Sequence, residues 1–128
     1  MKKIARIDEV ITRVNAGENV KFEEYPEINP ALYWAYRSSL RRDLEEVDFS
    51  EVIWEKDIDA IVNSLREAGH ETFTISSTFS SLLETIWEFE QRGCKMEGLK
   101  QVRQGYDDFN EETMKMEPAY KPAAVIRL

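Results

Sequence analysis

The chain has 128 residues, of which 42% are hydrophobic and 11% aromatic, so its length and composition are typical of one folded domain and exclude a disordered segment. Its 25 acidic and 17 basic side chains give a net charge of −8, which disfavours direct binding to nucleic acids or to anionic membranes. The single cysteine, Cys94, excludes an intrachain disulfide and is typical of a reducing compartment.

The N-terminal residues predict a short amphipathic helix over 4–16, followed by a glycine stop at Gly17. Its apolar residues recur at helical spacing: Ile4, Ile7, Ile11 and Val14. Charged residues fill the other positions and interrupt any signal-peptide core, and no run approaches the ~18 apolar residues of a membrane span. We therefore expect a cytoplasmic protein whose first helix docks against its own core or against a partner.

A second helix is predicted from Pro30 to about residue 46, because Asn29 is a good cap and proline suits the first helical position. Arg37, Arg41 and Arg42 form a basic cluster on this helix. Two interpretations stay open for the cluster. We favour ion pairs with neighbouring acids over a role in binding an anion, because charges on helix surfaces are usually solvated or paired.

Residues 47–53 alternate weakly and predict either an edge strand or an extended link. The clearest helix of the sequence follows. Between Trp54 and Ala68 the apolar residues keep a helical period, and Gly69 is the predicted stop.

The stretch from His70 to about residue 104 predicts a parallel βαβ crossover, in which two strands lie side by side under a covering helix. In the first strand Phe73 and Ile75 alternate with hydroxyl side chains, so one face should be polar or only partly covered. The helix ends near Gly93. The second strand begins at Lys95 and should carry a bulge at Gly98.

Residues 106–113 are predicted to form an acidic loop, and a final strand from about Tyr120 to Leu128 should pair antiparallel with the strand after Lys95. Pro122 confines the start of that strand to an edge or to its first residues. The predicted fold class is α+β, with N-terminal helices packed on a small mixed β-sheet built around the βαβ crossover and followed by an antiparallel strand. We expect one domain over 1–128, with a helical part at 1–47 and a βαββ-type core at 48–128.

A hydroxyl-rich turn is the most interesting local feature of the sequence. It joins the first strand of the crossover to its helix, where a helix N-terminus offers unpaired N–H groups to a phosphate, sulfate or carboxylate. The candidate anion-binding residues are Ser76, Ser77, Thr78, Ser80 and Ser81. The turn lacks the glycines and the lysine of a phosphate loop, so we favour the competing interpretation that these hydroxyls only cap the helix.

Other chemistry-bearing residues match no catalytic pattern. His70 has no second histidine to complete a metal site, and Cys94 is most simply a small buried residue. The acidic loop lacks the spacing of a calcium loop. The tryptophans, Trp34, Trp54 and Trp87, are expected mostly in the core or at its rim, whereas an exposed pair would indicate an interface. We predict no catalytic residue, no metal site and no cofactor.

The run FTISSTFSSLLETIWEFEQRGCKMEGL, preceded by DFSEVIWEKDI, resembles a family of small uncharacterised proteins encoded on conjugative or other mobile elements of Gram-positive gut bacteria. The resemblance covers approximately residues 48–104. The family has no established activity, so the resemblance implies a genomic setting and assigns no catalytic residue.

The function expected from these observations is a non-enzymatic accessory protein of a mobile element that acts through contacts with a protein partner or a second copy of itself. The candidate interface residues lie in the first helix and the acidic loop: Ile4, Ile7, Ile11, Asp107, Asp108, Glu111 and Glu112. The alternative is a small-ligand or enzyme-like domain that holds an anionic group at residues 76–81. A weaker alternative is a DNA mimic, against which the interspersed lysines and arginines argue.

Overall fold

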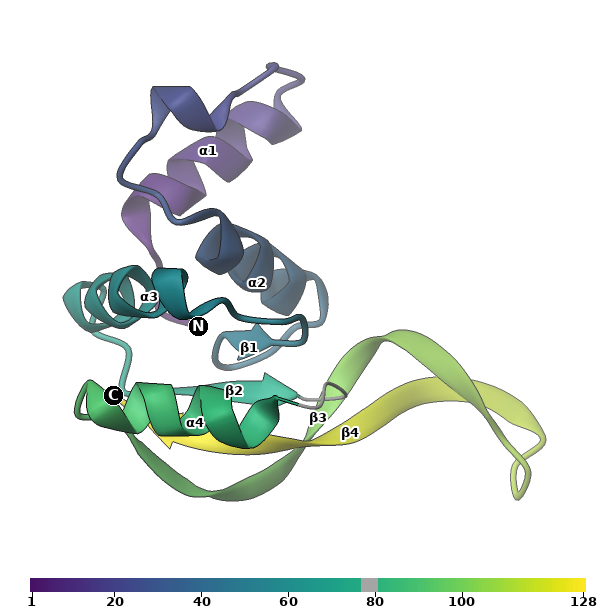
Figure 1. Cartoon of the computed structure of the whole chain (residues 1–128). Coiled ribbons are helices and arrows are strands. Elements are labelled where there is room, and N and C mark those ends of the chain that lie inside the picture. The colour runs from purple at the N-terminus through teal and green to yellow at the C-terminus, as the bar shows by residue number, and fades with distance from the viewer. Residues whose placement is uncertain (77–80) are drawn as a thin grey trace.

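The computed structural model describes residues 1–76 and 81–128, and it confirms an α+β fold in which N-terminal helices precede a four-stranded mixed sheet (Figure 1). The helical elements are α1 (Ala5–Asn15), η1 (Phe22–Glu24), α2 (Pro30–Arg41), α3 (Glu55–Glu67) and α4 (Leu82–Gln91). The strands are β1 (Asp48–Phe49), β2 (Thr72–Ser76), β3 (Lys95–Asn110) and β4 (Lys115–Arg127).

Local signals account for most helix ends. The side chain of Asn29 accepts a hydrogen bond from the backbone N–H of Leu32 and so caps α2, as predicted. Gly17, Gly69 and Gly93 follow three helices with φ values of +88°, +81° and +84°, which a side chain would strain. The prediction that the second helix runs to residue 46 is wrong, because Asp43 takes a left-handed φ of +58° and the helix ends at Arg41.

The strand order β1-β2-β4-β3 contradicts the predicted pairing within the crossover. β2 and β3 do not lie side by side, because β4 lies between them and pairs antiparallel with both. The predicted antiparallel pairing of β3 with the last strand is confirmed, as is the bulge next to Gly98. Residues 47–53 contribute the short edge strand β1, which pairs parallel with β2.

The central position of β4 has a physical reason in its side chains. The run Ala123–Ile126 is apolar throughout, and Ala123, Ala124 and Ile126 are buried, as suits a strand flanked on both sides. β3 exposes most of its side chains and carries two register shifts, as suits an edge strand. Its long hairpin with β4 pairs the two strands locally, whereas β2 and β3 are joined through a helix.

The core lies between the helices and one face of the sheet. Phe73 of β2 packs edge-on against Phe49 of β1 and, tilted, against Phe89 of α4. Leu65 of α3 and Ile126 of β4 belong to the same buried cluster.

The opposite face of β2 is polar, as predicted. On this face Thr72 is half-buried, whereas Thr74 and Ser76 are 0% and 2% exposed.

Residues 106–110 differ from the prediction, because they form the end of β3 and not a loop. They extend the sheet into a twisted two-stranded ribbon that projects away from the helices (Figure 1). We call residues 106–118 of this ribbon the β3–β4 arm.

Candidate functional site

A buried ion pair lies where the end of α2 meets the sheet. Nη1 of Arg42 is 2.9 Å from Oδ2 of Asp48, and these side chains are 4% and 0% exposed. Arg42 directly follows α2 and Asp48 begins β1, so the turn between these two elements places the two side chains next to each other. Two charges are tolerated in an interior only when they are paired and their remaining polar atoms have partners.

The strand β2 supplies the partners that Asp48 requires. Oδ1 of Asp48 accepts hydrogen bonds from the Thr74 hydroxyl at 2.6 Å, from the Ser76 hydroxyl at 2.9 Å and from the Ser76 backbone N–H at 3.1 Å. The backbone N–H of Asp48 donates to the hydroxyl of Ser39 at 2.8 Å. Both carboxylate oxygens therefore receive donors from the chain itself, which makes Asp48 an organising residue and not a general base.

The same cluster reaches the opposite edge of the sheet. Nη1 of Arg42 donates to the carbonyl oxygen of Arg103 in β3 at 3.0 Å, and Nε2 of Gln104 lies 3.4 Å from the Ser76 hydroxyl. Because β1 and β3 are the two edges of the sheet, these contacts require that the sheet is strongly coiled. The Asp48 network consists of Ser39, Arg42, Asp48, Thr74, Ser76 and Gln104.

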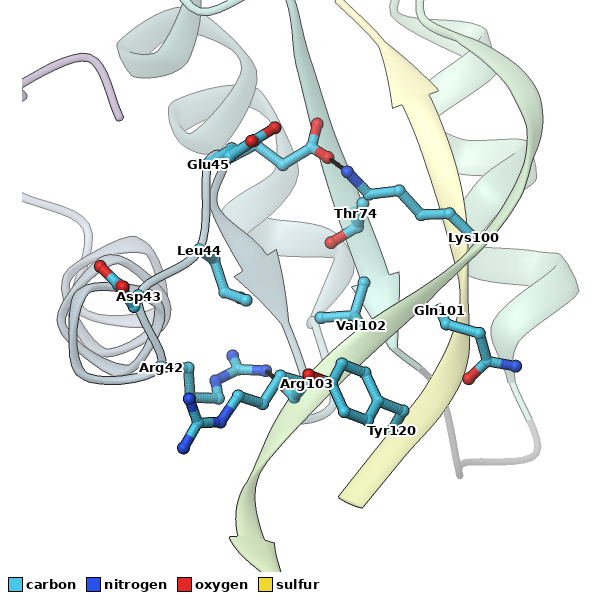
Figure 2. Close-up of a pocket in the computed structure, with 11 residues that line it drawn as sticks. Arg42, Asp43, Leu44, Glu45, Thr74, Lys100, Gln101, Val102, Arg103 and Tyr120 are labelled. Atoms are coloured by element: carbon cyan, nitrogen blue, oxygen red, sulfur yellow. Dashed lines mark hydrogen bonds and ion pairs between the residues drawn. The ribbon is translucent and has the colours of Figure 1, made fainter. Parts of the chain in front are cut away.

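Two hollows flank the Asp48 network. The first has a volume of about 280 Å³ and lies between residues 42–46 and strands β2 and β3, with an ion pair between Lys100 and Glu46 at its rim (Figure 2). Figure 2 also shows the side chains of Arg42 and Arg103 next to each other below this hollow. The second, about 290 Å³, lies between the end of α2 and the root of the arm.

The second hollow is basic. The side chains that line it include Arg41, Arg42 and Arg103 against one carboxylate, Asp107. Of the arginines, Arg42 is paired with Asp48, while no described residue forms an ion pair with Arg41 or Arg103. The predicted basic cluster is thus divided: Arg42 takes the ion-pairing role, and Arg37 instead donates to the Tyr33 hydroxyl and lies over the Trp34 ring.

Only two residues of the predicted hydroxyl-rich anion site lie in the described part of the chain. The Ser76 hydroxyl donates to the Asp48 carboxylate, whose charge would repel an anion. Ser81 is the residue before α4, and its side chain makes no capping bond to a described residue. Ser77, Thr78 and Ser80 lie outside the described residues, so anion binding at this turn stays a prediction.

The candidate interface residues of the first helix mostly face inward. Ile4 and Ile7 are buried in the chain's own core, and Ile11 is half-buried against it. Of the two docking sites expected for this helix, the chain's own core is the one observed.

The acidic candidates all lie on the arm. Asp107 and Asp108 are exposed residues of β3, and Glu111 and Glu112 are exposed in the turn that joins β3 to β4. Asn110 shapes this turn, because its side-chain oxygen accepts from the backbone N–H of Glu112 at 2.9 Å.

The arm has two chemically different faces. Phe109 pairs with Met116 across the ladder and Asp107 pairs with Pro118, so these four residues share a face, which continues to Tyr120. The other face carries the pairs Asp108–Glu117 and Asn110–Lys115. The first face is mainly apolar and exposed, because Phe109, Met116 and Tyr120 are 53%, 62% and 58% exposed.

His70 and Cys94 are buried, and burial sets their titration. Burial lowers the pKa of His70, although the hydrogen bond between its Nε2 and the carbonyl of Lys2 (2.9 Å) acts in the opposite direction. Burial raises the pKa of the Cys94 thiol, which disfavours the thiolate form at neutral pH. The tryptophans were expected mostly in the core or at its rim, and none is in the core, since Trp34, Trp54 and Trp87 are each more than half exposed.

A family model covers most of the chain. Residues 31–124 match the model described as a domain of unknown function, DUF7698. The chain belongs to this family. The match includes α2 from Ala31 onward, the whole Asp48 network and the arm, and it is wider than the segment 48–104 on which the sequence resemblance rests. No curated protein and no solved structure matches the chain.

None of the helices within residues 1–76 and 81–128 combines the length and the apolar character needed to cross a membrane. No group of three acidic, histidine or cysteine side chains in these residues is placed to hold a metal ion.

Sequence reasoning missed the centre of the site. Asp48, Arg103 and Gln104 were not candidates, and each becomes important only through residues distant in the chain. One signal was present for Asp48: it is a charged residue between the apolar residues Val47 and Phe49. No comparable signal marked Arg103.

Proposed function

We propose that the chain is a non-enzymatic binding protein that holds a protein partner through the apolar face of its β3–β4 arm. The exposure of this face carries the proposal. A two-stranded ribbon is only marginally stable by itself, and apolar side chains gathered on one exposed face are characteristic of contact surfaces. Phe109 and Met116 lie directly opposite each other on that face and offer one contiguous apolar contact.

The charge of the arm defines the chemistry of the partner. Residues 106–117 carry five acids (Asp107, Asp108, Glu111, Glu112 and Glu117) and one base, Lys115, so the segment has a net charge of −4. A partner should therefore present an apolar groove with a basic rim. A second copy of this chain fits less well, because its own net charge is also negative, at −8.

We include the genomic setting in the proposal. The resemblance of residues 48–104 to proteins encoded on mobile elements supports an accessory role in such an element, in which the arm contacts a protein of the element or of its host.

The test compares the wild-type chain with the double variant Phe109→Ser and Met116→Ser as immobilised bait. Both side chains are exposed, so the double variant should keep the thermal stability of the wild type. We expect the wild type to capture a protein. The affinity of that protein for the double variant should be at least about tenfold lower, because exposed aromatic and Met anchors dominate such contacts. Higher salt should also weaken binding, because the arm is acidic.

Leu83→Ser is the matched control, because Leu83 is 81% exposed but lies on α4, outside the arm. A captured protein that the double variant and the wild type bind equally would contradict the proposal. Light scattering during size-exclusion chromatography addresses self-association. If the wild type is a dimer and the double variant is a monomer, the partner of the arm is a second copy of the chain and not a basic protein.

A further inference from the structure

We propose that the hollow between the end of α2 and the root of the arm binds the phosphate group of a small molecule. This hollow has a volume of about 290 Å³ and is lined by Arg41 and Arg42 on one side and by residues 103–107 of β3 on the other. The proposal rests on Arg41, Arg42 and Arg103, which lie outside the arm, although the hollow borders the arm at Tyr106 and Asp107.

The charges around the hollow favour a multiply charged anion. Three arginines line it against one carboxylate, Asp107, so its lining has a net charge of +2. The charge is still +1 when Asp48 behind Arg42 is counted. This is a local excess of positive charge in a chain whose net charge is −8. A phosphate monoester, with a charge between about −1.5 and −2 at neutral pH, complements it.

The arginines differ in how they are held. Arg42 is fixed before any ligand arrives, because its guanidinium donates to the Asp48 carboxylate, to the Arg103 carbonyl and to the Ser38 carbonyl. The guanidinium groups of Arg41 and Arg103 donate to no other described residue. In contrast, Arg6, Arg13, Arg92 and Arg127 all form ion pairs with acids. Forked guanidinium donors suit the oxygens of phosphate.

The backbone of β3 at the hollow also lacks its usual partners. The pairing with β4 passes from Arg103–Tyr120 directly to Asp107–Pro118, so residues 104–106 have no paired residues in β4. Such a bulge leaves backbone N–H groups for other acceptors. Gly105 lines the hollow although its φ is not left-handed and a Cβ would meet no atom within 4 Å. The fold therefore does not require glycine at 105.

The test is an NMR titration of the full chain with inorganic phosphate and, separately, with glycerol phosphate at constant ionic strength. We expect saturable shifts of the amides of residues 38–42 and 103–107. Arg103→Gln and Arg41→Gln should each raise the dissociation constant by about tenfold. Arg37→Gln is the matched control, because it removes the same charge from the same helix but Arg37 does not line this hollow.

The two probes distinguish the possible ligands. Tighter binding of glycerol phosphate supports a phosphorylated metabolite, and equal binding of both probes supports free phosphate. Two results would overturn the proposal, because each shows only general attraction to positive charge. One is amide shifts that do not saturate, and the other is binding that Arg37→Gln weakens as much as Arg103→Gln does. Saturable shifts confined to residue 81 and its neighbours would overturn it in favour of the hydroxyl-rich turn.

Discussion

The carboxylate of Asp48 is 0% exposed and receives hydrogen bonds from two β2 residues and from Arg42. A buried pair of this kind adds little net stability compared with apolar residues of the same size. Removing either charge alone is costly, however, because the other charge then stays buried without a partner. Asp48 therefore contributes less to the stability of the fold than to which segments of the chain pack together.

Asp48→Asn should lower the free energy of unfolding by about 3–5 kcal/mol, because it leaves the Arg42 guanidinium buried without a counter-charge. Urea denaturation followed by tryptophan fluorescence measures this loss. Asp59→Asn is the control, since Asp59 is 74% exposed in its pair with Arg92, and such pairs contribute about 0–1 kcal/mol. Equal losses in the two variants would show that the Asp48 pair is not isolated from solvent.

At the same scale, the sequence predicted apolar residues better than polar ones. Phe73, Ile75 and Cys94 were expected in the interior and are buried. Their burial follows from alternation and residue type, which are properties of neighbouring positions. The role of Asp48 depends on Thr74 and Ser76, which lie 26 and 28 residues further along the chain, so no local pattern contains it.

Among the elements, β4 is the one whose position the sequence did not reveal. A final strand that pairs antiparallel with β3 was predicted from the sequence, but its insertion beside β2 was not. The short register of β2 with β4, Thr72–Arg127 to Ser76–Ala123, is enough to place β4 at the centre. Because β2 ends there, Pro122 lies just outside the part of β4 that pairs on both sides, where its missing N–H is tolerated.

Hydrogen exchange measured by NMR tests the central position of β4. The consecutive amides of Ala124, Val125 and Ile126 should all be protected, because successive residues of a central strand donate to neighbours on opposite sides. In β3, residues 99–102 should alternate between protected and exchanging amides, because β3 is an edge strand. Alternating protection in β4 with continuous protection in β3 would contradict this strand order.

In the whole molecule, the N-terminal segment is tied to the end of α3 at a point where helices and sheet meet. Nζ of Lys2 donates to the carbonyl of Gly69 at 2.7 Å, and the carbonyl of Lys2 is 2.9 Å from Nε2 of His70. His70 directly precedes the segment that leads into β2. A change in its charge therefore acts on the packing of the first helix against the rest of the chain.

Global stability should rise with pH as His70 loses its proton. Burial lowers the pKa of His70 in the folded chain, so below the unfolded-state pKa of about 6.5 the unfolded chain binds more protons than the folded one. This contribution to stability is fully present above pH 6.5 and decreases as the pH falls from there toward the folded-state pKa of His70. Urea unfolding midpoints measured across this pH range give the slope of stability against pH.

His70→Gln keeps an amide donor near the Lys2 carbonyl but cannot titrate, so its midpoints should change less with pH. Because His70 is the chain's single histidine, no other side chain has an unperturbed pKa in this range. An unchanged slope in His70→Gln would assign the pH dependence to other groups.

The sequence by itself determined the α+β class, the cap of α2, the glycine stops and the bulge at Gly98, because these features depend on residues within a turn or a strand of each other. Only the tertiary structure decided the strand order, the Asp48 network and the convergence of Arg41 with Arg103. These features arise where distant segments meet, and the decisive free energy there comes from which surfaces are buried together. Local backbone and side-chain preferences do not encode that choice.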